Sequence, residues 1–523
     1  MEDSLTIASQ FSRVASSRPI EDLSLGTEPL SITDELVTRF PDGVLPVSQW
    51  TGLSSDDKYL SHMLYLFFTW DQTLSHIVPR TVFLEDLKAG PTKTTKFCSR
   101  FLVHCLIAVS HIFISQEALL PQVQDLRFRG RMFADEALRI LEDERQRPSI
   151  TLLQGLMGLW IYEVNYGQKA QATGLLEEFY CFHNALELSH LALPNAEDAA
   201  PSQVSRSMTE WQILSSIIWG FFCLEAKIST MFSRAMKITK PMVPETFDAM
   251  YSFILVRSEA SERFWSPYPC DQFRGQSLYR ECISLECQLA VLVQEASKFF
   301  TPTEARIPAL YRNEKRAIDG KLRRWATNVL QSFLGRTTVV PSILFLEITY
   351  EMVLLKLLSH PCEACPQDDT HEVPAHERAL YGASVISKLW TYRVTYGLRH
   401  EYWLMQACLV AATAIIFKAK DNSSLSKSMV IACQLLYSIG EFLPVANQYL
   451  LAIKDLACQH TIELPKACRV VFSGSTIRTK PITIKGPMLI NIGLDYSGSS
   501  VALSSASVQV KFSGVIQGIH HYF

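Results

Sequence analysis

Apolar residues recur at helical spacing almost without interruption from Asp56 to about Cys468. They fall three or four positions apart, so that each segment has one apolar face, and short breaks with Pro, Gly, Asn or Asp separate many of the segments. Hydrophobic residues form 48% of the chain and charged residues only 19%, so a packed interior is expected. Because no fixed-period repeat is evident, we predict an irregular all-α multi-helical bundle rather than a regular solenoid.

Several helices can be placed from their start signals. Ser99 stands where an N-cap belongs, a helix is predicted around residues 130–145, and Pro148 with Ser149 begins another helix that Gly167 can end. Further helical segments are predicted at residues 211–232, 278–300, 318–333, 342–358, 377–395, 402–418 and 424–443.

Residues 66–87 predict two amphipathic helices joined by a turn. Pro79 ends the first helix, and Thr81 can cap the second. Leu64, just before this unit, shares helical spacing with Phe67, Phe68 and Leu74, and the second helix is predicted to bury Phe83, Leu84 and Leu87. The unit is a structural brace and carries no chemistry of its own.

The N-terminal residues differ in composition from the helical body. Residues 1–58 contain ten acidic and four basic residues and few aromatic ones. We therefore predict an acidic flexible tail at 1–58, with no stable core before about Leu60. The helical body is predicted to span residues 59–468.

The C-terminal residues 469–523 lose the helical pattern. They are rich in Ser and Gly and hold five basic residues and one acidic residue. Ile482 and Ile484 alternate with polar residues ahead of a Lys-Gly-Pro turn, and residues 508–512 alternate again. We predict a weakly ordered, β-prone tail; the same composition fits a disordered tail or the product of a wrong exon boundary.

The sequence indicates a reducing compartment. The first residues, which include Glu2 and Asp3, show neither a secretory signal nor an Arg-rich transit peptide. The longest uncharged stretches, 101–116 and 402–417, fall short of the roughly 18 apolar residues that a membrane span needs, and we predict that both are buried helices. Thirteen cysteines, mostly in apolar helical contexts, favour reduced core thiols over a disulfide framework. The glycosylation sequon at Asn422 is then predicted to be unused.

Four motifs follow the opening unit in order, at residues 130–167, 211–229, 318–325 and 341–361. Together with the Phe-Thr-Trp run at residues 68–70, they resemble the middle homology region of fungal binuclear zinc-cluster transcription factors. The resemblance covers roughly residues 60–420. Its matching residues in the first two motifs are Glu136, Ala137, Leu138, Ser149, Ile150, Leu153, Gln154, Glu163, Gly167, Trp219, Gly220, Phe222, Leu224 and Ser229.

The chain departs from this family pattern at three places. Glu225 stands where Asp is usual, Ser233-Arg234-Ala235 where Gly-Arg-Pro is frequent, and His360 where Arg is common. The resemblance implies the fold of a fungal transcription factor regulatory domain, acting on RNA polymerase II target genes in the nucleus, and not a catalyst. The partners it implies are other transcription factor subunits, in a homodimer or a heterodimer.

The zinc cluster of that family has no counterpart in the sequence. Such a cluster needs six thiolates in a short basic segment, and no cysteine precedes Cys98. We expect no cofactor in this chain, with zinc only if an upstream cysteine cluster is missing from the sequence. Either an upstream exon has been lost, or a shortened member regulates without its own DNA-reading module. Because the formal net charge is −3, promoter DNA is expected to be reached only through a missing or a partner's zinc cluster.

One group of residues has the chemistry of a metal site. Cys362 and Cys365 form a Cys-x-x-Cys pair flanked by His360 and His371. A structural zinc site normally combines two compact ligand doublets, and Pro residues stiffen this loop, so free loop thiols are the preferred interpretation and no metal ligand is predicted. His371 and His376 are too far apart for a metalloprotease helix.

A basic cluster could contact phosphate or direct nuclear import. It consists of Arg312, Lys315, Arg316, Lys321, Arg323 and Arg324. Glu314 and Asp319 interleave it, and Ile318, Leu322 and Trp325 share an inner face, so a solvated helix surface is the preferred interpretation.

No catalytic or cofactor-binding residue is predicted. The sequence lacks a dinucleotide-binding Gly motif, a phosphate-cradling Gly-Lys-Ser/Thr loop and a Gly-x-Ser-x-Gly elbow. Two alternatives to a transcription regulator stay open. One is a helical scaffold or co-regulator that does not bind DNA, and the other is a helical enzyme of secondary metabolism, for which no Asp-rich metal helix is present.

Overall fold

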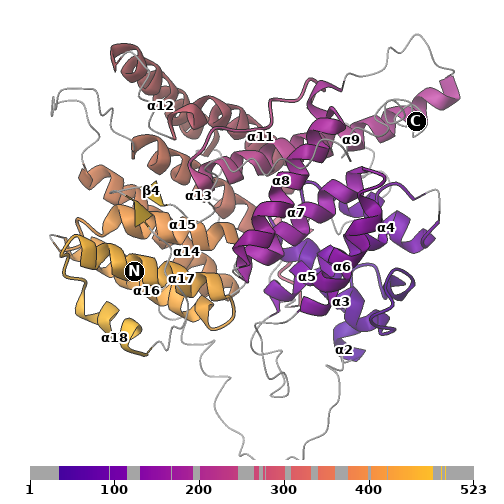
Figure 1. The fold of residues 1–523 in the computed structure, drawn as a ribbon, viewed down its shortest axis with the longest axis horizontal. Coiled ribbons are helices and arrows are strands. Elements are labelled where there is room, and N and C mark those ends of the chain that lie inside the picture. Colours follow the sequence, from indigo (N-terminus) through magenta and orange to yellow (C-terminus); the bar gives the residue numbers. More distant parts are fainter. Residues whose placement is uncertain are drawn as a thin grey trace, which may run out of the picture.

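The computed structural model describes residues 34–92, 95–114, 130–166, 168–191, 201–245, 264–269, 275–276, 278–300, 308–330, 340–359, 375–397, 402–420, 422–474, 484–485 and 489–490. Over these residues the chain is all-α apart from two-residue strand pairs, which confirms the predicted fold class. One large hydrophobic cluster extends from Phe40 to Cys468 and holds the helices together. Figure 1 shows the N-terminal helices on one side of the molecule and the C-terminal helices on the other.

The N-terminal half is built around α5 (Arg100–Ser110) and α7 (Ile150–Asn165). α5 packs against α3 (Asp57–Trp70), α6 (Arg131–Glu144) and α7, and α7 packs against α8 (Lys169–Ala185). α4 (Arg80–Ala89) follows α3, and the long helix α9 (Pro201–Phe232) ends this half. The hydroxyls of Ser99 and Ser149 cap α5 and α7, each accepting a backbone N–H at 3.1 Å, so both predicted helix starts are confirmed.

The C-terminal half surrounds α15 (Tyr402–Ile415), whose residues are all buried. Its other helices are α11 (Tyr279–Ala296), α12 (Pro308–Leu330), α13 (Pro341–Leu358), α14 (Ala375–Tyr396), α16 (Ser423–Gly440), α17 (Pro444–Gln459) and α18 (Lys466–Gly474). α13, α14, α16 and α17 all contact α15. α12 lies at the outer edge of the molecule (Figure 1).

Short elements complete the fold. They are α2 (Asp34–Val37) and 3-10 turns at Val47–Gln49, His111–Phe113, Leu188–His190 and Ser297–Phe299. Strand β1 (Phe264–Trp265) pairs antiparallel with β2 (Gly275–Gln276), and β3 (Ile484–Lys485) pairs with β4 (Leu489–Ile490). The second pair flanks the turn predicted in the C-terminal tail, whereas the alternation predicted at 508–512 lies outside the described residues.

The two halves interlock. α9 contacts α11, α13 and α15, and α7 contacts α15 and α17. The segment 264–269, which follows α9 in the chain, returns to the N-terminal half. There Trp70 Nε1 donates to the Tyr268 carbonyl at 2.7 Å, and His62 Nδ1 lies 2.6 Å from the Tyr268 hydroxyl.

The opening brace differs from its prediction. α3 ends at Trp70 because Asp71 Oδ1 accepts the backbone N–H groups of the next turn, at distances from 2.5 to 3.1 Å. Such a local side-chain bond competes with helix continuation. Pro79 stands at the N-cap of α4, and Thr81 lies inside the first turn, so the predictions that Pro79 ends the first helix and that Thr81 caps the second are wrong. Proline suits the start of a helix, where its missing N–H is not needed.

The core begins earlier than predicted. Leu45 and Val47 have no exposed surface, Phe40 and Trp50 are also buried, and Trp50 Nε1 donates to the Leu87 carbonyl at 2.9 Å. The expectation that no stable core precedes about Leu60 is therefore wrong for residues 40–50. This stretch is too short to fold alone, but its apolar side chains pack into the main hydrophobic cluster of the helical body. The division of the chain into a tail at 1–58, a helical body at 59–468 and a tail at 469–523 stays a prediction.

One helix of the described chain, at Glu210–Phe232, is long and apolar enough to cross a membrane, and all of its apolar window is buried inside the body. α5 and α15 are buried helices, as predicted for the stretches 101–116 and 402–417. The side chain of Asn422, the sequon residue, caps α16 by accepting the Ser424 N–H at 2.8 Å.

Candidate functional site: buried polar networks along α9

α9 carries polar and charged side chains in the interior of the protein. Glu225 and Lys227 are only 1% and 2% exposed, and Ser229 and Thr230 have no exposed surface. They belong to the same apolar run that carries the Trp-Gly motif. Because a buried charge is strongly unfavourable unless it is paired and hydrogen-bonded, each of these ions needs a specific partner.

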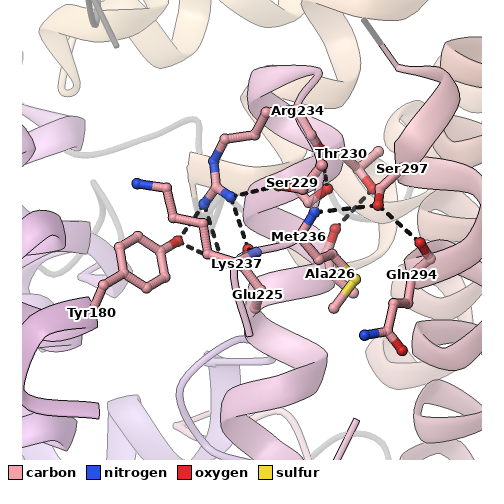
Figure 2. A network of polar contacts seen from close by, with 11 residues as sticks. Tyr180, Glu225, Ala226, Ser229, Thr230, Arg234, Met236, Lys237, Gln294 and Ser297 are labelled. Atoms are coloured by element: carbon pink, nitrogen blue, oxygen red, sulfur yellow. Dashed lines mark hydrogen bonds and ion pairs between the residues drawn. The ribbon is translucent and has the colours of Figure 1, made fainter. Parts of the chain in front are cut away.

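The first group of contacts, here called the Glu225 network, joins α8, α9 and the loop after α9 (Figure 2). Arg234 Nη1 donates to Glu225 Oε1 at 2.8 Å, and the Tyr180 hydroxyl donates to Glu225 Oε2 at 2.5 Å. The backbone N–H of Lys237 donates to Oε1 at 2.5 Å. Arg234 also donates to Tyr180 and stacks over its ring, 5.3 Å from the centroid. The carboxylate thereby accepts hydrogen bonds from α8 and from the loop after α9.

The loop after α9 is held by further polar contacts. Ser233 has φ of 50°, in the left-handed region that glycine adopts most readily. The chain therefore makes this turn with Ser at the place where the family that the sequence resembles often has Gly. The Ser229 hydroxyl donates to the Arg234 carbonyl, and the Met236 N–H donates to Ser297 Oγ at 3.2 Å (Figure 2). These bonds fix the loop between α9 and the end of α11.

Lys356 of α13 reaches the same loop. Its ammonium donates to Ser233 Oγ at 2.8 Å, and the residue is only 2% exposed. Burial lowers the pKa of Lys356 to about 8. Among the residues that the structure describes, no carboxylate pairs with it, so the Ser233 hydroxyl is its polar anchor.

The second group of contacts, the Lys227 network, joins α9, α11 and the opening turn. Lys227 Nζ lies 2.9 Å from Glu286 Oε1 and donates to the Gln72 carbonyl at 3.0 Å. His76 Nδ1 lies 3.2 Å from Glu286 Oε2. The network thus connects three segments that are far apart in the sequence.

Protonation in this network follows from burial and charge. Burial lowers the pKa of His76 to about 4, so the imidazole is neutral at pH 7. Burial by itself would raise the pKa of Glu286, but the attraction of His76, when its ring is protonated, and of Lys227 outweighs burial, so the pKa is lowered. Since His76 is neutral, we assign the positive charge opposite Glu286 to Lys227. Burial raises the pKa of Asp71 to about 6, although three backbone N–H groups and Lys227 oppose the shift.

The contacts in both networks favour a structural role for these residues over a catalytic one. Each carboxylate faces cations and N–H or O–H donors, and none of the contacts described here activates a hydroxyl or thiol nucleophile. Cys223 and Cys287 lie close to the Lys227 network, with their sulfurs 3.5 Å apart. Burial raises the pKa of both thiols, which disfavours the reactive thiolate.

The predicted metal candidate lies outside the described residues. Cys362, Cys365, His360 and His371 all fall in the stretch 360–374, so their interpretation as free loop thiols stays a prediction. His376 is on α14 and exposed. Within the described part of the chain, no group of three or more His, Cys, Asp or Glu side chains could hold a metal ion.

The basic cluster lies on α12, with part of its charge neutralised. Lys321 pairs with Glu295 at 2.6 Å, and Arg323 pairs with Asp319 at 2.9 Å. The predicted inner residues Ile318, Leu322 and Trp325 are buried, and Arg316 and Arg324 are exposed. The interpretation as a solvated helix surface stays a prediction.

The motif residues meet at the opening turn. Gln154 of α7 donates to the Ile77 carbonyl. Gly220 of α9 lies against the same turn, so close that an added Cβ would come within 2.8 Å of the His76 carbonyl oxygen. Trp219 Nε1 donates to the Val243 carbonyl at 3.0 Å. Gly167 lies outside the described residues. The described members of this set hold the body together.

Sequence reasoning missed the partners of α9. Lys227, Glu286 and Lys356 were not singled out, although each interrupts an otherwise apolar helical run. Such an interruption indicates a buried ion, because an exposed position would sit on the polar face of the helix. The pattern does not tell which distant residue provides the opposite charge.

Comparison with known proteins gives three informative relatives. The chain is 23% identical over 449 residues to the nitrogen assimilation transcription factor nit-4 of Neurospora crassa, covering 82% of this chain and 39% of that protein. It is 24% identical to the notoamide biosynthesis transcriptional activator notL' of Aspergillus versicolor, covering 84% and 72%. It is 21% identical to the nitrogen assimilation transcription factor nirA of Emericella nidulans, covering 83% and 48%. The chain thus spans less than half the length of two of these proteins. No family model and no solved structure matches it.

Proposed function

We propose that this chain is a fungal transcription regulator and that its helical body is the regulatory and dimerising region. The observation that carries the proposal is the similarity along most of the chain to three fungal proteins named as transcription factors or activators. These relatives are regulators rather than enzymes. The ordered motif series supports the same assignment, since Gln154 and Gly220, from two different motifs, both contact the opening turn.

The mechanism that this architecture supports is conformational. α9 and α7 contact helices of both halves, and two buried ionic networks join α9 to α8, to the loop after α9, to α11 and to the opening turn. A signal that shifts one half would therefore change the packing of the other. In this proposal the body transmits the signal to promoter-bound partners.

The proposed partners are other transcription factor subunits, and the proposed location is the nucleus. The subunits form a homodimer or a heterodimer. DNA would be contacted through a zinc cluster of the kind that the resembled family carries, contributed by a missing segment or by the partner. The formal net charge of −3 supports the proposal that another segment or a partner contacts the DNA, because a chain that binds DNA by itself needs a positive surface.

A tethering experiment tests the proposal. The full chain would be fused to a heterologous DNA-binding domain and expressed in a filamentous fungus with a matching promoter reporter. We expect reporter output to change severalfold relative to the DNA-binding domain alone. The matched variant carries Glu225→Gln, which disrupts the Glu225 network and should return the output toward the control. An unchanged reporter with a stably expressed wild-type fusion would count against a regulatory role.

A further inference from the structure

The exposed side of α14 carries no acidic residue, lysine or arginine. This helix of 22 residues packs on α13, α15 and α16, and its exposed residues are His376, Leu380, Ser387, Trp390, Thr391, Val394 and Thr395. The charged residues of α14 are only partly exposed. Two of them are held by neighbouring helices, since Glu377 pairs with Arg323 at 3.5 Å and Lys388 with Glu351 at 2.8 Å. A helix face that contacts only water normally carries charges, so this face has the composition of an interface.

Large apolar side chains are grouped on this face. Leu380 is 50% exposed, Trp390 38% and Val394 57%. Among the helices that the structure describes, α14 is the only one with more than one exposed large apolar side chain. Single exposed apolar residues are ordinary, whereas a group of them on one element indicates a contact with another protein surface.

The spacing of these residues suits a helical partner. Steps of four and three residues alternate along the helix, which is the spacing of the contact line between two packed helices. We call this line the α14 seam, and it consists of His376, Leu380, Ala383, Ser387, Trp390 and Val394.

A second copy of the chain offers a matching surface. The seam contains no ion, so two copies meet there without opposed like charges. If the two helices run antiparallel with the two-fold axis at Ser387, Leu380 faces Val394 and the bulky Trp390 faces the small side chains of Ala383 and Ser384. A parallel pair would instead place Trp390 against Trp390. The described part of the chain has no second group of this kind, so a contact between unlike faces would leave the seam against a polar surface.

The size of the seam sets the strength of the contact. From His376 to Thr395 the exposed face is about 28 Å long, and a helix is about 10 Å wide. Two copies therefore bury much less than the roughly 800 Å² per partner of a stable interface. The area is consistent with a weak dimer whose Kd is about micromolar or higher. Such a contact becomes effective when two copies are held close together, because tethering raises their effective concentration.

We propose that the α14 seam is the surface through which two copies of this chain pair, in an antiparallel contact centred on Ser387. The inference rests on the proposed function for its biological role, since it names the surface of the proposed homodimer. Purified protein tests it without a promoter. A monomeric chain that still changed reporter output would refute the seam and leave the regulatory role standing.

Sedimentation equilibrium of the purified full chain over a concentration series is the first experiment. We expect the average mass of the wild type to rise toward that of a dimer as the concentration increases. Val394→Glu should weaken the association at least tenfold, because it buries an unpaired charge in the contact. Leu310→Glu is the control, since Leu310 is 55% exposed on α12, and it should associate like the wild type.

Two outcomes of this series would overturn the proposal. One is a wild type that stays monomeric at every concentration, whether another subunit or a segment of the same chain covers the seam. The other is a Val394→Glu protein that associates as strongly as the wild type, which would place the contact on a different surface. Should Val394→Glu fail to fold, Thr391→Lys adds a charge on the same exposed face and takes its place.

A short bismaleimide cross-linker tests the geometry. Ser387→Cys lies at the proposed two-fold axis, so we expect covalent dimers of this variant. Gln434→Cys, at an exposed position of α16, is the control, and the exposed Cys181 and Cys458 give both proteins the same background. Equal cross-linking of the two variants would overturn the placement of the axis on the α14 seam.

Discussion

At the scale of single residues, each buried ion of α9 is paired with groups from other segments of the chain. Glu225 stands where the family that the sequence resembles usually has Asp, and its carboxylate accepts hydrogen bonds from Arg234, Tyr180 and a backbone N–H. The longer side chain places the carboxylate farther from the α9 backbone than Asp would. The buried charge is thereby matched by donors on every side, so the residue is sensitive to any change that keeps its size but removes its charge.

Replacing Glu225 by Gln tests this dependence. Glu225→Gln leaves the guanidinium of Arg234, whose side chain is only 13% exposed, without its counter-charge. We expect a loss of about 3 kcal/mol in the free energy of unfolding, measured by chemical denaturation. Glu142→Gln is the control, because the Glu142 side chain is 73% exposed in its pair with Arg145 and should lose less than about 1 kcal/mol. Equal stability of the two variants would contradict the assigned role.

Buried histidines make the protein sensitive to acid. His183 is 1% exposed between Phe179 and Phe221, and burial lowers its pKa to about 4, as it does for His76. Below an unfolded pKa of about 6.5 the unfolded chain binds a proton that the folded chain rejects, so stability falls as the pH is lowered from about 6.5 to 4. Asp71 has the opposite sign, because its raised pKa of about 6 favours protonation in the folded state.

The variant His183→Gln isolates one of these contributions. We expect its free energy of unfolding to fall less than that of the wild type between pH 7 and pH 5, by about 2 kcal/mol at pH 5. The measurement is a pair of urea titrations at the two pH values. A parallel decline of both proteins would show that His183 does not titrate as its burial implies.

At the scale of elements, α9 depends on one close contact with the opening turn. Gly220 faces the opening turn, where an added Cβ would meet the His76 carbonyl at 2.8 Å. Gly174 of α8 has nothing within 4 Å of the same position. Of these two helical glycines in the same half, Gly220 leaves no room for a side chain, whereas Gly174 does.

These glycines predict opposite effects of one substitution. Gly174→Ala should stabilise the protein by up to about 1 kcal/mol, since alanine favours the helix. Gly220→Ala should destabilise it by about 1 to 3 kcal/mol, because the turn must move away from α9. Thermal unfolding of both variants checks the pair, and a stabilised Gly220→Ala protein would mean that the turn is not packed as described.

Elements with a strong local signal were predictable, and elements set by distant contacts were not. Ser99 and Ser149 marked helix starts correctly because a cap acts within one turn. The predictions that Pro79 ends the first helix and that Thr81 caps the second were wrong, because α3 already ends at Trp70, where Asp71 begins the turn. α8 and α17 were not singled out, although Pro444 begins α17. At the candidate site the buried ions left a trace in the sequence, but the pairing of Lys227 with Glu286 depends on the tertiary fold.

At the scale of the whole molecule, the net charge argues against DNA binding by this chain alone. The exposed arginines of α12 are few, and the chain as a whole carries a formal net charge of −3. Binding to DNA through phosphates alone requires many released counterions. A body of this kind gains little from DNA contact by itself.

We expect the purified full chain to bind promoter DNA only weakly, with a Kd of about a micromolar or more at physiological salt. Fluorescence anisotropy with a labelled promoter fragment, repeated at low and high salt, provides the measurement. Arg316→Glu, on the exposed face of α12, should leave the weak binding nearly unchanged. A salt-sensitive nanomolar complex would show that the chain contains its own DNA-reading surface.

The contact of α7 with α15 and α17 also bears on how the protein is made. On the ribosome, Trp160 emerges nearly 300 residues before the end of α17 at Gln459. At roughly 5 to 20 residues per second, the apolar surface of the N-terminal half stays uncovered for on the order of tens of seconds. During that time the nascent chain exposes the part of α7 that α15 and α17 later cover, and we expect a chain that stops before α17 to be less stable than the full chain.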